Sequence, residues 1–209
     1  MSKTETNKPT IPYRQIRALY HSDTISLYQA YSATIAIPAV AHQRLDASPT
    51  FSPTRMTWFK PSWCWMMYRS GYSYKDVNQS HILALTMSHA KFRELLMHAV
   101  VCGKGTLTKE QKAKDVRVQW DPERGPRLEP LGHRSLQVGV SGETGRKMVR
   151  DWIVGIGDVT ERAREMKQVV DQEGEAVDWR MLVERGLVLE EREYVVDDEL
   201  RKVLEMDKR

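Results

Sequence analysis

The chain has 209 residues, of which 41% are hydrophobic and 29% are charged. This length is enough for one domain with a full hydrophobic core, and the composition is typical of a soluble globular protein. No apolar run approaches the roughly 18 residues of a membrane span, and the start MSKTETNKPTIP has no apolar signal core, so a membrane protein is excluded. We expect an intracellular protein, cytoplasmic with a nuclear location left open.

Charge is divided unevenly along the chain, although the formal total is only +4. Residues 157–209 contain 10 Lys and Arg and 16 Asp and Glu, whereas residues 1–156 contain 22 basic and 12 acidic residues. A basic body of this kind is typical of proteins that contact phosphates, which makes RNA or DNA an expected partner. An ordinary solvated surface with an acidic C-terminal helix is the alternative.

The predicted elements follow from turn residues and from the period of the apolar positions. Residues 1–11 are expected to be disordered. The elements that follow are, in chain order, a strand at 24–31, a helix at 32–45, a strand at 55–60, a helix at 62–69, a strand at 81–88, a helix at 89–101, an exposed basic connection at 103–115, a strand at 116–120, a loop at 121–132, a strand at 134–140 and a helix at 141–156.

Several residues mark the ends of these helices. Ser32 and Ser141 are expected N-caps, and Pro38 is expected to bend or break the first helix. Pro61 is placed at a first helical turn, and Gly71 ends that helix. Beyond residue 158 the chain is predicted to be largely helical and to pack on the body through its apolar residues, which are Trp179, Leu182, Val183, Leu187, Leu189, Val195 and Val196.

This order of elements predicts an α+β fold with a split or mixed β-sheet core and flanking helices. We expect a core domain at residues 12–156 and a charged helical segment, residues 157–209, packed on it. Too few strands are separated by crossover helices for a doubly wound sheet. GKGTLTK lacks the spacing GxxxxGK[ST] and GVSGETG does not follow GxGxxG, so a P-loop enzyme or a Rossmann dehydrogenase is disfavoured.

The first candidate binding residues lie in IPYRQIRALYHSDTISLYQAYS. Arg14 and Arg17 are three residues apart, which would place them on one face of a helical turn or at a bend. They precede a strand that carries Tyr28, Gln29 and Tyr31. Arginine matches phosphate oxygens and tyrosine stacks on rings, so a phosphate-bearing ligand is indicated. Alternatively, the arginines pair with surface carboxylates while the tyrosine rings pack in the core.

The second group lies in RMTWFKPSWCWMMYRSGY, residues 55–72. Alternation places Met56, Trp58 and Lys60 on one side of the predicted strand. Trp63 and the Met66–Met67 pair make one apolar helical face, which is more typical of a core than of a cofactor site. Four polar residues at the strand-to-helix junction and along the helix are candidates for an anion site, because free backbone N–H groups suit an anion there: Lys60, Ser62, Tyr68 and Arg69.

The third group lies at the end of a strand in VQWDPERGPRLEPLGHRSLQV. Gln119, Asp121 and Glu123 alternate into a Pro/Gly loop, where catalytic acids and ribose-binding groups are frequent. Gln137 in the next strand is a further candidate. Tight-turn chemistry in the sequence Asp-Pro-Glu-Arg-Gly is the alternative explanation.

Metal and nucleophile signatures are not found. The 6 His are scattered without Cys or Asp at ligand spacing, so we predict no metal site. Cys64 and Cys102 are expected to be free, buried thiols, because two cysteines cannot form a disulfide framework. Without a GxSxG elbow or a Ser/His/Asp set, a hydrolytic nucleophile is not supported.

Taken together, the quoted blocks resemble an uncharacterised domain-of-unknown-function family of bacteria and fungi. The resemblance covers residues 12–185 and is most specific in WFKPSWCWMMYRSG. A more distant resemblance is to the ADP-ribosyltransferase fold. It rests on the order of LYQAY, a helix of small residues, WFKPS and a helix ending in Tyr, followed by a late strand with a carboxylate. This resemblance implies NAD as a substrate, bound in a split β-sheet, and ADP-ribose transfer. The basic body then favours RNA or DNA as the acceptor.

The transferase resemblance also implies residue roles. Arg14 or Arg17, with Gln29, would hold the phosphates and the nicotinamide side of NAD, and Ser62 and Tyr68 would flank the nicotinamide. Tyr28, Lys60 and Arg69 complete the expected NAD-binding set on the residue chemistry given above.

The implied catalytic residues are Glu123, Tyr68 and Gln137. Glu123 would orient the ribose, although Gln119 and Gln137 are alternatives for its position. Gln29 stands where such families place His or Arg, which is a departure from the pattern. A non-catalytic nucleic-acid or nucleotide-binding module is the alternative function.

Overall fold

The computed structural model describes residues 11–52, 54–103 and 105–208. The predicted disorder of residues 1–11 therefore falls, Ile11 apart, outside the described part of the chain. The described residues form a mixed α+β structure with several sheets and eight α-helices, which confirms the predicted α+β class.

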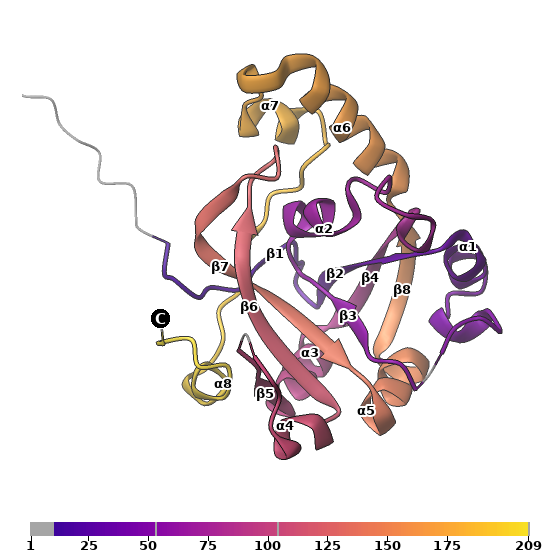
Figure 1. Cartoon of the computed structure of the whole chain (residues 1–209), viewed down its shortest axis with the longest axis vertical. Helices are drawn as coiled ribbons and strands as arrows, with labels where there is room; N and C mark the ends of the chain where they lie inside the picture. Colours follow the sequence, from indigo (N-terminus) through magenta and orange to yellow (C-terminus); the bar gives the residue numbers. More distant parts are fainter. Residues whose placement is uncertain (1–10, 53, 104, 209) are drawn as a thin grey trace, which may run out of the picture.

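Two main sheets are built almost entirely from antiparallel pairs (Figure 1). The first sheet has the strand order β2 (Thr24–Tyr31), β4 (His81–Ser88) and β8 (Ile153–Asp158). The second has the order β3 (Thr57–Phe59), β7 (Pro130–Val140), β6 (Val116–Arg124) and β5 (Ala99–Val101). Only β5 and β6 run parallel within these sheets, and a small third sheet pairs β1 (Arg17–Ala18) with β9 (Arg192–Glu193).

Helices flank the sheets at both ends of the molecule (Figure 1). The α-helices are α1 (Ala33–His42), α2 (Trp63–Ser70), α3 (His89–Met97), α4 (Lys109–Ala113), α5 (Gly142–Lys147), α6 (Thr160–Glu173), α7 (Trp179–Glu184) and α8 (Asp198–Val203). The short helical segments are η1 (Leu45–Ala47), η2 (Val77–Gln79), the π-helical η3 (Met148–Trp152) and η4 (Gly174–Ala176).

The two main sheets meet at one isolated backbone bridge between Tyr28 and Lys60. The Tyr28 amide donates to the Lys60 carbonyl at 2.6 Å, and the Lys60 amide donates to the Tyr28 carbonyl at 3.0 Å. From this bridge the end of β2 and the start of β3 diverge, because a cavity lined by residues from both strands lies between them. The bridge therefore positions Lys60 at the inner end of that cavity.

Two hydrophobic clusters cover opposite faces of the first sheet. One cluster joins β2 and β4 to the second sheet and to α1, α3 and α8, and it includes Leu27, Leu85, Val138 and Leu200. The other packs α2, α6 and α7 on the opposite face and includes the predicted apolar residues Trp63, Met66 and Met67, which are all buried. Alternation along β2 and β4 divides their side chains between the two clusters.

Several predicted elements were wrong in extent or type. The helix predicted for 89–101 ends at Met97, and residues 99–101 form β5 because β-branched Val100 and Val101 pair with the open edge of β6. The helix predicted for 141–156 stops after η3, and its end forms β8 beside β4. Gly155 and Gly157 disfavour a helix there, and the edge of β4 supplies hydrogen bonds instead.

Two predicted loops contain regular structure. Residues 121–124 continue β6, and β7 begins at Pro130, so the expected loop is largely a long hairpin. The connection at 103–115 contains α4, whose N-terminus has a reciprocal capping box between Thr108 and Gln111. In the C-terminal segment Leu182 and Leu187 are buried as predicted, but Trp179 and Val195 are exposed.

Candidate functional site

A cavity of about 380 Å³ lies between the two sheets, and we call it the inter-sheet cleft. Its walls come from the end of β2, from β3, from α2 and from the η2 turn. The volume is within the range of pockets that hold small ligands. Its polar and aromatic lining includes Gln29, Tyr31, Arg55, Trp58, Lys60, Arg69 and Asp76.

Lys60 is the most unusual residue of the cleft, because its side chain is almost fully buried. Its Nζ donates to Oε1 of Gln137 and lies 4.0 Å from the centre of the Trp65 ring. Burial lowers the pKa of Lys60 to about 7; nearby Asp121 opposes this shift and Arg69 adds to it. A buried lysine that titrates near neutral pH, in a cleft, is a frequent mark of a functional site.

The polar face of the second sheet extends the site behind Lys60. Gln137 donates through Nε2 to Oε1 of Gln119 at 2.8 Å, so a chain of amides runs from Lys60 across β7 to β6. Asp121 is two residues further along β6, and alternation places it on the same face as Gln119. The opposite face of these strands carries the buried apolar residues of the core.

The indole of Trp58 forms a flat part of the cleft wall. Trp58 on β3 is paired with Gly139 on β7, and a Cβ added at Gly139 would lie 2.8 Å from three atoms of the indole. The ring therefore lies directly over the glycine, where any larger residue would displace it.

Gly139→Ala is expected to displace the Trp58 ring. Overpacking of this kind lowers the free energy of unfolding by about 1–2 kcal/mol. Urea titration followed by tryptophan fluorescence measures both the stability and the change in the indole environment. Gly157→Ala is the matched control, because nothing lies within 4 Å of a Cβ added there. Equal behaviour of the two variants would contradict the close packing of Trp58 on Gly139.

Ser62 and Glu123 are brought together at the N-terminus of α2. Ser62 is the N-cap: its Oγ accepts from the Trp65 amide at 3.2 Å and donates to Oε1 of Glu123 at 2.7 Å. The same carboxylate oxygen accepts from the Arg124 amide at 2.8 Å. Burial raises the pKa of Glu123, and these hydrogen bonds oppose the shift. Glu123 is thus held against α2, and it is not among the residues that line the inter-sheet cleft.

A second buried carboxyl group, Glu191, lies beside Glu123. Its Oε1 accepts from the Trp63 amide at 2.6 Å. Burial, and then the neighbouring Glu123, raise the pKa of Glu191 well above its usual range. Sequence reasoning missed Glu191 because its burial depends on its contact with Trp63, which is 128 residues away in the sequence. No local pattern distinguishes it from the exposed Glu190.

The two N-terminal arginines contact the C-terminal segment and do not reach the cleft. Arg14 donates to the Glu205 carbonyl at 2.8 Å, and Arg17 donates to the Glu191 carbonyl at 2.8 Å. Arg17 lies in β1 and Arg14 in an isolated bridge, so the chain here is extended. The helical-turn interpretation of their spacing was therefore wrong, because residues three apart in extended chain point to opposite sides.

Two of the predicted tyrosines, Tyr28 and Tyr68, are also separated from the cleft lining, whereas Tyr31 is part of it. Tyr28 is buried against Trp63, with ring centres 5.1 Å apart in an edge-on arrangement. Tyr68 is 41% exposed and stacks on Arg124, whose guanidinium carbon lies 3.7 Å from the ring centre.

The structure thus brings together one part of the predicted set. Gln29, Lys60 and Arg69 line the cleft, and Gln137 contacts Lys60 from behind. Met56, Trp58 and Lys60 all line it, but so does Thr57, which the alternation along the predicted strand had placed on the other side. The cleft lining does not include seven of the ten predicted site residues: Arg14, Arg17, Tyr28, Ser62, Tyr68, Glu123 and Gln137.

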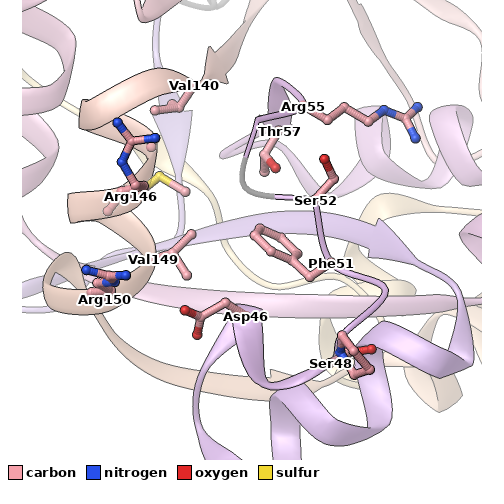
Figure 2. Close-up of a pocket in the computed structure, with 13 residues that line it drawn as sticks. Asp46, Ser48, Phe51, Ser52, Arg55, Thr57, Val140, Arg146, Val149 and Arg150 are labelled. Carbon is pink, nitrogen blue, oxygen red and sulfur yellow. The ribbon is translucent and has the colours of Figure 1, made fainter.

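A second cavity, of about 300 Å³, adjoins the cleft and is shown in Figure 2. We call it the arginine-rimmed pocket, after Arg55, Arg146 and Arg150 in its lining. Both cavities are lined by Phe51, Ser52, Arg55 and Thr57, which come from the segment before β3 and its first residue.

Within the described ranges, no group of three or more His, Cys, Asp or Glu side chains is placed to hold a metal ion. Of the helices described, none is both long and apolar enough to cross a membrane. Cys64 and Cys102 are buried and free, as predicted.

The sequence model of a family described as a domain of unknown function (DUF4291) matches residues 15–194. No curated protein matches the chain.

Proposed function

The chain belongs to the DUF4291 family, whose description names no reaction, and from the site we propose that the protein is an NAD-dependent ADP-ribosyltransferase acting on a nucleic acid. One observation carries the proposal: a ligand-sized cleft, at the place where two antiparallel sheets diverge, combines three cationic side chains with an indole surface. These are the groups that a dinucleotide with two linked phosphates requires.

The cations of the cleft supply the phosphate contacts in this proposal. Among the described residues, Arg55 and Arg69 form no ion pair with a carboxylate, so their guanidinium groups need not give up a partner to bind a ligand. Lys60 would add a third donor from the inner end of the cleft. Trp58 would stack on one ring of NAD, and the Gln29 amide matches the hydrogen-bonding groups of a carboxamide.

The reaction in this proposal breaks the bond between C1′ of the ribose and the nicotinamide nitrogen. Nicotinamide leaves with the electron pair, an oxygen or nitrogen of the acceptor forms a bond to C1′, and the acceptor loses a proton. Positive charge develops on the ribose in the transition state, and a nearby carboxylate stabilises it. Asp121 is our candidate for that carboxylate, because alternation along β6 places it on the same polar face as Gln119, whereas Glu123 caps α2. Asp121 lies behind Lys60, outside the cleft lining, and raises the pKa of Lys60 against the effect of burial.

One observation favours a non-catalytic nucleotide-binding module as the second candidate. Among the described residues, Asp76 is the only acid that lines the cleft, and its carboxylate accepts from the Asn78 amide at 2.8 Å and from the Gln79 side chain. A binding protein needs no acid at the ribose.

The test is incubation with labelled NAD and a panel of RNA and DNA. We expect nicotinamide release and label transfer, and Asp121→Asn is expected to lower both by about 10²–10³-fold while NAD still binds. Glu123→Gln is the control carboxylate, expected to change stability more than transfer. NAD binding without release or transfer would establish the binding module, and a folded protein that does not bind NAD would overturn both functions.

A further inference from the structure

We infer that the arginine-rimmed pocket binds the phosphorylated terminal nucleotide of the acceptor nucleic acid. The inference rests on the proposed function and names the part of the acceptor that is recognised. It depends on the floor of this pocket, the charges at its rim and the wall that it shares with the inter-sheet cleft.

The floor is apolar and suits a flat ring. The side chains of Phe51, Val149 and Thr57 lie toward one another across the pocket in Figure 2. Phe51 and Val149 are each only 8% exposed, so a bound ring would complete their burial. Bases stack on aromatic side chains without regard to sequence. The volume of about 300 Å³ is at the lower limit for small-ligand pockets, which favours one nucleotide over a dinucleotide.

The rim carries positive charge on the side formed by α5 and η3. Arg146 and Arg150 are four residues apart on this continuous helical segment and lie at the same edge of the pocket (Figure 2). Arg150 has no carboxylate partner among the described residues, and Arg146 has an exposed pair with Glu143 at 2.9 Å, which costs little to exchange. Two neighbouring guanidinium groups match the oxygens of a terminal phosphate.

The one acid in the pocket lining does not oppose this charge strongly. Asp46 accepts from the guanidinium of Arg44 through both carboxylate oxygens, at 3.0 and 3.1 Å. The π-helical form of η3 is a further sign of function, since such segments are rare and are frequent at functional sites. It is this segment that brings Val149 to the floor and Arg150 to the rim.

The shared wall connects the pocket to the proposed reaction. Phe51, Ser52, Arg55 and Thr57 line both cavities, so a nucleotide in the pocket would share a wall with the cleft. The Arg55 side chain points away from Arg146 and Arg150 in Figure 2, which leaves it available to the cleft. An acceptor end in this pocket would therefore lie next to the bound NAD.

The experiment uses short fluorescent RNA and DNA oligonucleotides that carry a 5′-phosphate, a 3′-phosphate or only hydroxyl ends. Wild-type protein is expected to bind one phosphate-ended form at least about fivefold more tightly than the hydroxyl form, measured by fluorescence anisotropy without NAD. Arg150→Gln is expected to remove this preference. Lys147→Gln is the matched control, because Lys147 is an exposed cation on the same segment that does not line the pocket.

Two results would overturn the inference: equal binding of phosphate and hydroxyl ends by wild-type protein, or equal weakening by Arg150→Gln and Lys147→Gln. Nicotinamide release into water reports on the cleft independently of any oligonucleotide. A retained terminal-phosphate preference without nicotinamide release by wild-type protein would therefore overturn the proposed reaction while supporting a terminal-phosphate site in the pocket. If Arg150→Gln also lost nicotinamide release, the arginine-rimmed pocket and the inter-sheet cleft would not be separate sites.

Discussion

Lys60→Met is expected to abolish ADP-ribose transfer and, at the same time, to raise the free energy of unfolding. Methionine has nearly the length of lysine and fits an apolar site, so the stem of the side chain keeps its packing. The charge that would contact a phosphate is lost, and we expect NAD affinity to fall by at least about 10-fold. Most substitutions at buried positions lower the free energy of unfolding, so an increase in this variant would be informative.

The gain in stability follows from the lysine pKa. Burial lowers the pKa of Lys60 from 10.5 to about 7, and each unit corresponds to about 1.4 kcal/mol, so the buried charge costs roughly 4–5 kcal/mol below pH 7. Removing the ammonium also leaves the Gln137 side-chain carbonyl without its hydrogen-bond donor, and this loss reduces the gain in stability by about 1–3 kcal/mol. The net stabilisation expected is about 2 kcal/mol.

The stabilisation is also expected to depend on pH. Since the folded pKa is the lower one, wild-type stability rises as pH increases from about 7 to 10.5, and the advantage of the methionine variant shrinks over this range. Urea unfolding at several pH values measures this difference. Lys202→Met, at an exposed position on α8, is the control and is expected to change stability by less than about 0.5 kcal/mol. A less stable Lys60→Met variant at pH 6 would contradict the assigned burial cost.

Glu191→Gln is expected to remove most of the loss of stability that the wild-type protein shows as pH rises. Glu191 and Glu123 are neighbouring buried carboxyl groups, and their raised pKa values mean that the folded state retains protons that the unfolded chain releases. Stability is therefore full below about pH 4.5 and falls as pH rises toward the folded pKa values, by up to about 1.4 kcal/mol per unit for each proton. The glutamine carbonyl can still accept from the Trp63 amide.

The measurement is urea unfolding between pH 5 and pH 8. The glutamine variant should be the more stable protein at pH 8, and the difference should decrease toward pH 5. Glu190→Gln, at the exposed neighbouring position, should follow the wild-type curve. If the free energy of unfolding changed with pH in the same way for wild type and Glu191→Gln, the Glu123 and Glu191 pair would not retain a proton in the folded state.

The sequence predicted best what depends on short-range alternation. β2 and β4 have the predicted bounds, and the side of β3 that carries Trp58 and Lys60 lines the cleft. It predicted poorly what depends on a free sheet edge: residues 153–158 are apolar enough for a helix end, and only the neighbouring β4 makes them a strand. Local pattern cannot show which edge is open.

The candidate site could also be predicted only in part, because local pattern shows some of its residues but not the contacts between distant segments. Lys60 and Arg69 are unusual because they interrupt an apolar stretch, and both line the cleft. Glu123 was selected for its place at a strand end, but its hydrogen bonds to Ser62 and the Arg124 amide hold it at the start of α2. The role of Glu191 depends on a chain segment more than 100 residues away from its partner Trp63.

The backbone bridge between Tyr28 and Lys60 has a mechanical consequence. It ties the two main sheets together at this point, so if one sheet rotated against the other, the cleft would widen or narrow while residues at the bridge moved least. Lys60 would then keep its burial and its low pKa at every cleft width, whereas Trp58 and Arg55, further along the opening, would follow the moving wall. Closure around a ligand would thus change the outer contacts and leave the inner ammonium in place.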